Sequence, residues 1–361
     1  MSEESRRTGT GMTGTERIRR CVPELIDWYR QNRRSLPWRE DRTPYSVWVA
    51  EIMLQQTRIE AAIGYYRRFL DALPDVRALA VVEDDRLLKL WEGLGYYSRA
   101  RNLKKAAQRI VEDFGGELPR TAAELKTLPG VGDYTAGAVA SIAWGEPEPA
   151  VDGNVLRVVM RALARPDDVM ELSTRREVTE LLREVYPRGE EAALLTEGIM
   201  ELGETICLPN GEPACLLCPL RGLCLACARG EQQDYPVRSK PKERRIERRT
   251  VLLLRCRDRF AVRRRPEEGL LAGLWEFPNR EGELEAEKLE KLLGAEALRC
   301  RELGRAKHVF SHVEWHMQGY LVDLEKEPEG FTWLTAEEIE ERCSIPTAFR
   351  YYKKKLHELS E

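Results

Sequence analysis

The chain has 361 residues, with 58 Lys and Arg against 61 Asp and Glu and a formal net charge of −3. This length suffices for two domains and a sizeable core, and the near-neutral charge excludes any nucleic-acid assignment based on overall basicity. No stretch of about 18 apolar residues and no apolar N-terminal segment is present, so neither a membrane helix nor a signal peptide is expected. Nine cysteines, four of them bunched, indicate metal ligation in a reducing, cytoplasmic compartment.

The N-terminal third is predicted to be helical after a disordered tail. Residues 1–15 are polar and rich in Gly and Thr, which is typical of disorder. From Arg17 onward apolar residues recur at helical spacing until the sequence Leu-Pro-Trp-Arg at 36–39. Pro44 then suits the first turn of a second helix, which is predicted to continue to Tyr66.

A carboxylate lies on the apolar side of that second helix. Glu51 follows Val47 and Trp48 by about one turn and precedes Ile52. Such a residue is either ion-paired or deliberately desolvated. A polar cluster, Gln-Gln-Thr at 55–57, lies near the helix end and is either a solvated face or a set of groups that read base edges.

Residues 87–103 contain an aromatic loop. Glycines flank Leu94, and Tyr96 and Tyr97 follow, with arginines close behind. Such a loop suits a wedge between stacked bases with phosphate contacts nearby. An ordinary loop whose tyrosines cap a helix explains the same pattern equally well.

The stretch 128–157 combines a turn and a carboxylate. Gly130 and Gly132 enclose a tight turn before an Ala-rich helix, and backbone N–H groups at a helix start can bind phosphate. Asp152 lies beyond the end of that helix and two residues before Asn154. A plain pair of antiparallel helices is the alternative for the turn alone. Further helices are expected at 155–164, 174–185 and 191–203.

Four cysteines follow within eighteen residues, spaced C-x7-C-x2-C-x5-C, at Cys207, Cys215, Cys218 and Cys224. An irregular loop of four thiolates suits an iron–sulfur cluster or a structural zinc ion. Zinc sites more often pair two C-x-x-C hooks, and only one is present, so the cluster is favoured. Cys227 is a spare thiol nearby.

The last part of the chain is expected to be a separate α+β domain. Residues 235–249 form a basic linker, either a solvated tether or a segment lying along phosphates. Two strands around a turn at Asp258, further strands, and an amphipathic helix at about 347–359 are predicted after it.

Residues 16–234 resemble the endonuclease III superfamily, because they contain in the same order Glu51, the glycine turn at 130–132 that enters a helix, Asp152 and the four-cysteine loop. With LWEFP at 274–278 and FSH at 310–312, the chain is similar to the bacterial adenine DNA glycosylases of the MutY type over all but about its first fifteen residues. The resemblance implies an all-α helix-hairpin-helix glycosylase domain (16–234) with an iron–sulfur loop, a linker (235–249) and a Nudix-like lesion-recognition domain (250–361).

This resemblance also implies an activity. Such enzymes excise adenine mispaired with 8-oxoguanine or guanine in duplex DNA, and we expect one [4Fe-4S] cluster, a monomer and a nucleoid-associated bacterial location. Glu51 would protonate N7 of adenine, and Asp152, kept ionised by hydrogen bonds and flanked by Asn154, would stabilise the sugar cation or add to it. Tyr134 would orient Asp152 or shield the cation.

Tyr134 also distinguishes two kinds of enzyme. Lyase members of the superfamily carry Lys at this position of the LPGVGDYTA motif, and without an amine no Schiff base forms there. The family resemblance places phosphate contacts at Gly130 and Gly132, cluster ligands at the four cysteines, and substrate contacts at Trp38, Arg39, Leu54, Gln56, Thr57, Leu94, Tyr96, Glu197, Met200, Phe310, Ser311 and His312.

Three rival functions have less support. A bifunctional glycosylase/lyase acting on oxidised bases conflicts with Tyr134. A Nudix hydrolase would need a Glu-rich REUxEExGU box, which the sequence EGELEAEKLEKLLGAE after 280 lacks. A non-catalytic lesion-binding protein would not need both Glu51 and Asp152.

Overall fold

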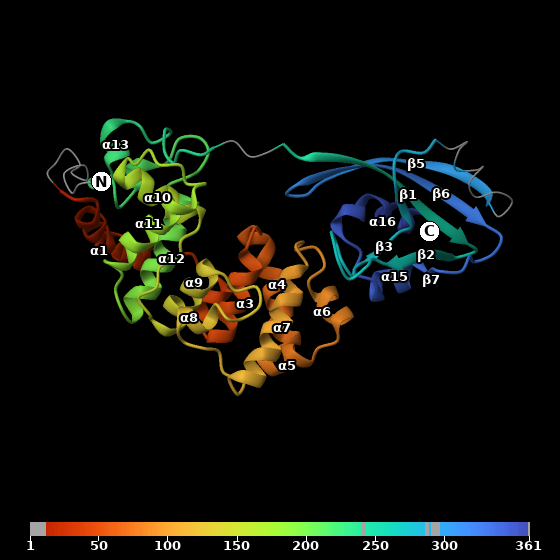
Figure 1. Cartoon of the computed structure of the whole chain (residues 1–361), viewed down its shortest axis with the longest axis horizontal. Helices are drawn as coiled ribbons and strands as arrows, with labels where there is room; N and C mark the ends of the chain where they lie inside the picture. The colour runs from red at the N-terminus through yellow and green to blue at the C-terminus, as the bar shows by residue number, and fades with distance from the viewer. Residues whose placement is uncertain (1–11, 240–242, 286–288, 290–296, 360–361) are drawn as a thin grey trace. The chain divides into compact units, whose positions relative to one another are not determined.

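The computed structural model describes residues 12–239, 243–285, 289 and 297–359 (Figure 1). The chain folds into two compact units. The first holds the chain up to Val81 together with Asn102–Lys240, and the second holds Val82–Arg101 together with Pro241–Glu361. Among the described residues, no helix has the length and apolar character needed to cross a membrane.

The first unit is helical. Its helices include several that begin at a Thr or Asp whose side chain accepts from an otherwise unpaired N–H group, or at a Pro that has no N–H group. The first unit contains α1 (Gly14–Asn32), α2 (Pro37–Glu40), α3 (Pro44–Leu54), α4 (Ile59–Ala72), α5 (Val76–Val81), α8 (Ala122–Leu125), α9 (Asp133–Trp144), α10 (Gly153–Leu163), α11 (Leu172–Arg183), α12 (Glu190–Thr205), the short 3-10 helix η2 (Cys215–Leu217) and α13 (Leu225–Arg229).

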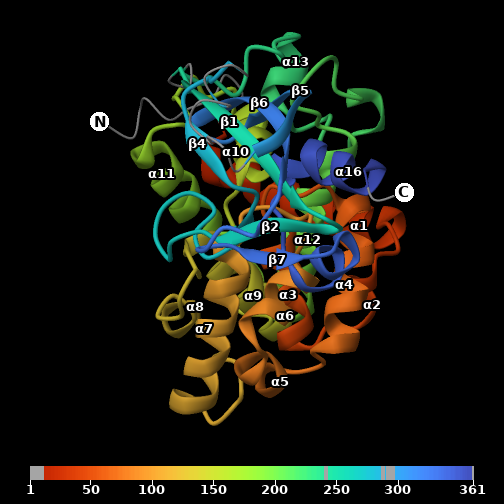
Figure 2. The same cartoon turned by 90° about the vertical axis from the view of Figure 1, so that its right-hand side faces the viewer.

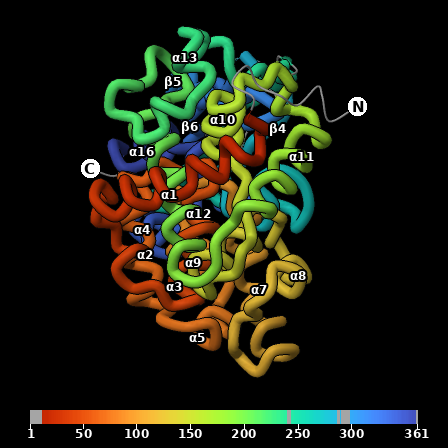
Figure 3. The backbone as a smooth tube through the Cα atoms, turned by 90° about the vertical axis from the view of Figure 1, so that its left-hand side faces the viewer, coloured from red at the N-terminus to blue at the C-terminus, as the bar shows by residue number. Residues whose placement is uncertain are grey.

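Helix α12 is the centre of this unit. It packs against α1, α9 and α10, and α3 packs against α9; Figure 3 shows α1 lying across α12. Small residues at 192, 193, 198 and 203 let neighbouring helices approach closely, and eleven of the sixteen residues of α12 are buried. The three helices expected at 155–164, 174–185 and 191–203 are confirmed as α10, α11 and α12.

One helix prediction was wrong. The continuous helix expected from Pro44 to Tyr66 is broken after Leu54, and α4 begins only at Ile59. Gln56 adopts a left-handed backbone conformation, with φ at 57°, which a helix cannot accommodate. Apolar periodicity continues through the break and therefore hid it. The break turns the Gln-Gln-Thr cluster out of the helix.

The second unit is a mixed sheet with helices (Figure 2). The strand order is β3-β2-β1-β6-β5, with β4 on β1 and β7 on β2, and only β1 and β6 pair in parallel among the described strands. The elements are β1 (Arg245–Cys256), β2 (Arg259–Arg264), β3 (Trp275–Glu276), β4 (Asn279–Glu281), β5 (Ala297–Val309), β6 (Val313–Leu324), β7 (Thr332–Leu334), α15 (Ala336–Arg342), η4 (Thr347–Phe349) and α16 (Arg350–Glu358), with α6 (Asp84–Leu90) from the earlier segment. Helix α7 (Ser98–Asp113) spans both units.

The core of the sheet domain is aromatic. Trp315, Phe260 and Phe277 are fully buried with Phe349 and Tyr352, which come from η4 and α16. The predicted strands on both sides of Asp258 and the C-terminal helix are confirmed. Their amphipathic patterns arise because one face of the sheet is covered by these helices.

Three expectations meet the structure only in part. Residues 1–11 of the predicted tail lie outside the described residues, and α1 begins at Gly14. Strand β1 begins at Arg245, inside the stretch expected to be a linker. The segment that replaces the Glu-rich box, 281–296, lies largely outside the described residues, at 286–288 and 290–296.

The end of α9 provides a test of packing. Gly145 has φ at 69°, and a Cβ there would meet the Cα of Gly189 at 2.7 Å and its carbonyl oxygen at 2.8 Å. Gly230 ends α13 with φ at 71°, but a Cβ there would meet nothing within 4 Å. We expect Gly230→Ala to cost about 1 kcal/mol, from left-handed strain alone, and Gly145→Ala to cost about 2–4 kcal/mol, since backbone must also move.

The measurement is the free energy of unfolding from urea titration of the full chain, followed by circular dichroism. Equal losses in the two variants would show that the approach of Gly189 adds no cost.

Candidate active site

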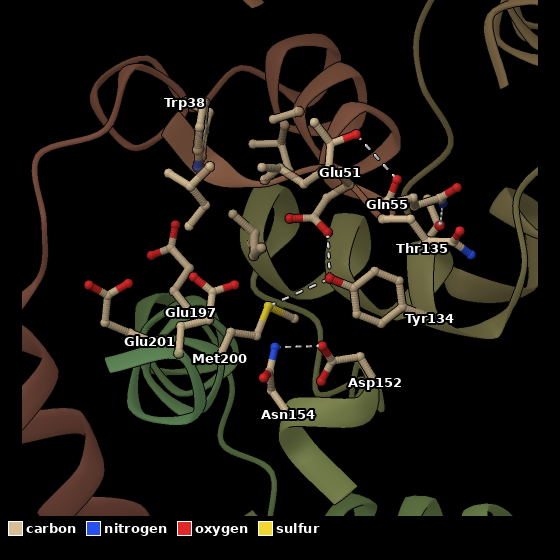
Figure 4. Close-up of a pocket in the computed structure, with 18 of the residues that line it drawn as sticks. Trp38, Glu51, Gln55, Tyr134, Thr135, Asp152, Asn154, Glu197, Met200 and Glu201 are labelled. Atoms are coloured by element: carbon tan, nitrogen blue, oxygen red, sulfur yellow. Dashed lines mark hydrogen bonds between the residues drawn. The ribbon is translucent and has the colours of Figure 1, made fainter. Parts of the chain in front are cut away.

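A pocket of about 690 Å³ opens in the first unit between α3, α9, α10 and α12. Figure 4 shows Glu51 on one side of it and Asp152 with Asn154 on the other, with Tyr134 between them. Twelve of the residues predicted from the sequence line this pocket: Trp38, Arg39, Glu51, Leu54, Gln56, Thr57, Gly132, Tyr134, Asp152, Asn154, Glu197 and Met200.

Glu51 is one of the buried carboxyl groups of the pocket. It lies in α3, and only 6% of the residue is exposed. Its Oε2 accepts a hydrogen bond of 2.8 Å from the Tyr134 hydroxyl. Burial raises the pKa of Glu51 to about 7, while the Tyr134 hydrogen bond acts in the opposite direction because it stabilises the charged form. Glu51 can therefore carry a proton near neutral pH.

The position of Tyr134 differs from the expectation that it orients Asp152. Its hydroxyl donates to Glu51 and also lies 3.6 Å from the Met200 sulfur. Burial and the neighbouring carboxylates raise the pKa of Tyr134 well above its ordinary value, so it stays a donor. Tyr134 lies in the first turn of α9, and the Gly132 turn aims it across the pocket.

Asp152 is the N-cap of α10. Its Oδ1 accepts from the Val155 backbone N–H at 2.8 Å, and its Oδ2 accepts from the Asn154 amide at 3.0 Å. Burial nevertheless raises its pKa, against these hydrogen bonds and the charge of Arg157. The expected hydrogen bonds are present, and they oppose the upward pKa shift that burial causes.

Arg157 ties this end of α10 to its surroundings. Its guanidinium donates to the Asn154 side-chain oxygen and to the carbonyl oxygens of Gly203 and Cys207, each at 2.7 Å. The amide that holds Asp152 is thus fixed by a buried cation. The same cation holds the start of the cysteine loop.

Further acids are matched by arginines. The Glu197 carboxylate accepts from Tyr29 at 3.0 Å and from Arg42 at 2.5 Å. Arg39, expected to contact substrate, donates to Glu201 at 2.8 Å. Arg34 holds Glu201 and the more exposed Glu204.

Sequence reasoning missed Glu201 and Glu204. Glu197, Met200, Glu201 and Glu204 are spaced i, i+3, i+4 and i+7 along α12. This spacing puts all four side chains on one face of the helix. The spacing could have found them. Arg42 and Arg34 carry no such signal, because they come from loops whose path the sequence does not define.

The break between α3 and α4 forms the pocket rim. Gln56 and Thr57 line it with Leu54, and the Gln55 amide donates to the Thr135 hydroxyl at 3.0 Å. Trp38 is buried on another wall, with its ring edge-to-face on Tyr66. Gln56 and Thr57 line the pocket because α3 ends at Leu54.

The turn at 130–132 has the predicted form. Gly130 has φ at 77°, and a Cβ there would meet the Asn102 side chain at 2.7 Å. Gly132 is the N-cap of α9, and nothing lies within 4 Å of its Cβ position. The first N–H groups of α9 have no partner within the helix, and Gly132 and Asp133 at this end of the helix are exposed.

The four cysteines share one loop of the first unit. Arg161 donates to the Cys207 sulfur at 3.3 Å, and the Gln232 amide lies 3.8 Å from the Cys215 sulfur. Burial raises the pKa of Cys218 to about 12 and that of Cys224 to about 11, with contributions from the other thiols of the loop.

The cysteine loop can be compared with what a metal group needs. In the part of the chain that the structure describes, no three His, Cys, Asp or Glu side chains converge as ligands of a single ion would. Each thiolate of an iron–sulfur cluster binds a different iron atom, so its ligands need not converge on one point. Four thiols in one loop, two of which accept from side-chain N–H donors, fit such a group.

The remaining predicted residues belong to the second unit. Leu94 is buried, whereas Tyr96 is 49% exposed, with its hydroxyl 3.1 Å from the Ser311 hydroxyl. Ser311 and His312 are exposed in the turn between β5 and β6, where Phe310 packs edge-to-face on Trp315.

Two family descriptions match this chain. Residues 49–188 match the HhH-GPD superfamily of base excision DNA repair proteins, and residues 250–355 match the NUDIX domain. The human adenine DNA glycosylase is 34% identical over 91% of this chain and 73% of its own length. An adenine DNA glycosylase of Buchnera aphidicola is 33% identical over 83% of this chain and 86% of its own length.

Solved structures agree with this for the helical unit. A thermostable thymine-DNA glycosylase superposes with a TM-score of 0.53 and 27% identity, over 59% of this chain and 97% of that one. Endonuclease III trapped covalently on DNA superposes with a TM-score of 0.51 and 28% identity, over 61% and 99%. The expected combination of a helix-hairpin-helix domain with a Nudix-like domain is therefore confirmed.

Proposed function

Since the chain belongs to the adenine DNA glycosylase family, we propose that it is a monofunctional enzyme that excises adenine mispaired with 8-oxoguanine or guanine in duplex DNA. The observation that carries this proposal is the pocket in which a protonatable Glu51 and a hydrogen-bonded Asp152 lie on opposite sides.

The two carboxyl groups suit the two halves of the reaction. A purine leaves readily once N7 is protonated, and Glu51 carries the proton for this step. The sugar becomes an oxocarbenium ion, and the Asp152 carboxylate, fixed by Val155 and Asn154, faces the developing charge. The rising positive charge of the sugar favours the ionised form of Asp152, which offsets the effect of burial on its pKa.

Adenine must leave the base stack to reach this pocket, which costs a few kcal/mol. The N–H groups at the start of α9 and the exposed turn at Gly130 and Gly132 support a phosphate contact that would hold the bent strand. Trp38, Arg39, Glu197 and Met200 would surround the extruded base.

The second unit supports the specificity for the opposite base. Tyr96, Ser311 and His312 present polar and aromatic groups on an exposed surface, which suits contacts to 8-oxoguanine. We propose that residues 250–361 form this recognition domain, without pyrophosphatase activity, that 16–234 form the catalytic domain, and that the basic stretch near 235–249 connects them. A monomer in the bacterial cytoplasm, associated with the nucleoid, is part of the same proposal.

We also propose one [4Fe-4S] cluster on Cys207, Cys215, Cys218 and Cys224. The fit of the thiols and their N–H donors supports it. When bound, the cluster would hold the loop after α12 in place; Arg157 already links that loop to Asn154.

Strand cleavage with and without alkali tests the activity. We expect single-turnover reactions on a duplex with adenine opposite 8-oxoguanine to give breaks only after alkali, because Tyr134 offers no amine for a Schiff base. Asp152→Asn should lower the rate at least about 1000-fold yet fold normally, since Asn also caps helices. Asp27→Asn, at an exposed position of α1 outside the pocket, is the control.

Breaks without alkali would favour the alternative, a bifunctional glycosylase/lyase acting on oxidised bases. Wild-type rates in Asp152→Asn would disprove the role of that carboxylate.

The pH dependence of the excision rate tests the role of Glu51 as the acid. Because the Glu51 pKa is raised to about 7, the protonated fraction is high below this value, and the rate should fall tenfold per pH unit above it. The Tyr134 hydrogen bond favours the charged form, so Tyr134→Phe should raise the Glu51 pKa and move the falling limb up by about 1 pH unit.

The measurement is the single-turnover rate from pH 5 to 9, roughly the range around the expected midpoint. Tyr186→Phe removes a buried hydroxyl that bonds Thr196 outside the pocket and is the control. If the falling limb of the pH–rate profile moves to lower pH in Tyr134→Phe, or does not move, Glu51 is not the acid that the profile reports.

Ligand removal tests the cluster. Purified protein should be brown and contain about four irons and four sulfides per chain. Cys224→Ser should lose the colour and iron, whereas Cys227→Ser should keep both. Retention of iron in Cys224→Ser with loss in Cys227→Ser would move the fourth ligand to Cys227, and stoichiometric zinc in colourless protein would exclude the cluster.

A further inference from the structure

The segment 82–101 interrupts the helical part of the sequence but belongs to the same compact unit as the C-terminal domain. It is attached near both ends: Asp85 pairs with Arg264, and Arg101 donates to the Ala272 carbonyl oxygen. Neither contact involves a residue that lines the pocket around Glu51.

The central attachment is an ion-pair cluster. Lys353 of α16 contacts Glu92 at 2.8 Å and Glu340 of α15 at 2.9 Å. Lys89 of α6 contacts Glu92 at 2.6 Å and donates to the Glu340 carbonyl oxygen. Two residues of the segment thus meet two residues of the C-terminal domain.

Burial makes the pair of Glu92 and Lys353 more than a surface contact. The two side chains are only 17% and 16% exposed, so solvent and salt screen them less than exposed pairs. Burial alone would lower the pKa of Lys353, but its hydrogen bonds to Glu92 and Glu340 raise it, so the ammonium stays charged. Removing either charge would leave the other desolvated.

The chain between Glu92 and Tyr96 is held in a fixed shape. Gly93, Gly95 and Tyr96 all have positive φ, at 103°, 70° and 46°. The guanidinium of Arg99 donates to the carbonyl oxygens of residues 94 and 95 and lies 5.6 Å from the Tyr96 ring centre. A shift of Glu92 is therefore passed to Tyr96 rather than absorbed by a flexible loop.

We propose that Lys353, acting through Glu92, is a positioning residue that sets the Gly93–Tyr96 loop against Ser311. The hydroxyl contact of 3.1 Å between Tyr96 and Ser311 is the part of the surface that this anchor aligns. The inference rests on the proposed function, in which these two residues contact the base opposite adenine. The anchor would then control discrimination of that base and leave the excision chemistry in the first unit unchanged.

The test compares single-turnover rates on duplexes with adenine opposite 8-oxoguanine and adenine opposite guanine. Lys353→Met should lower the ratio of the two rates on the order of three- to tenfold, mainly through the 8-oxoguanine duplex. Lys353→Arg keeps the charge and should restore most of the ratio. The control is Lys354→Met, because this neighbour on α16 is 79% exposed and lies 3.9 Å from Glu358.

A second readout does not depend on activity. Amide hydrogen exchange in 82–101 should speed up in Lys353→Met and in Glu92→Gln, and not in Lys354→Met, while exchange in α9 and α12 stays constant. If Lys353→Met fails to fold, Glu92→Gln carries the same test from the other side of the pair.

The outcomes separate the two levels of the proposal. Wild-type protein that does not excise adenine opposite 8-oxoguanine would refute the proposed function. Normal excision with an unchanged rate ratio in both Lys353→Met and Glu92→Gln would refute the positioning role alone. Equal slowing on both duplexes would also refute it, because the pair would then only stabilise the fold.

Discussion

The desolvation of Glu51 is the constraint on which the site depends. A carboxyl group in water is charged at neutral pH and cannot act as an acid, and the apolar residues of α3 reverse this by burying it. Burial of one acid has consequences for its neighbours. The pocket also contains Asp152, Glu197 and Glu201, and each is matched by an amide or an arginine rather than left alone. The arginines around the pocket are thus a condition for placing several acids together.

The sequence is informative about this site where the structure is local. Asp152 could be located because the Asp-Gly-Asn turn separates two helical stretches, and in the structure it is the N-cap of α10 with the capping bond present. Gly130 could be located because a positive φ and a close approach both require Gly. The helices of the first unit and the strands around Asp258 follow from apolar periodicity, since the buried face of each element is continuous.

What the sequence did not predict depends on contacts distant along the chain. The partner of Tyr134 is Glu51, 83 positions away, and no pattern within α9 indicates which carboxylate the hydroxyl meets. The pKa of Asp152 is raised by burial, which capping chemistry alone does not reveal. The helix break at Gln56 was missed because the apolar pattern continues across it. In each case a local pattern was not sufficient to predict the outcome.

The two compact units separate the residues proposed for base excision from those proposed for recognition of the opposite base, although these residues alternate along the sequence. Segment 82–101 lies between two parts of the helical unit in sequence, yet its ion pairs join it to α15 and α16. Of the two acids that would break the glycosidic bond, Asp152 is held within the first unit by Asn154, which Arg157 fixes to α12, and Glu51 is held by the Tyr134 hydroxyl. The exposed Tyr96 is held by charges of the second unit. Because the two sets of contacts share no residue, selection for discrimination of the opposite base can alter one set without disturbing the pKa of Glu51.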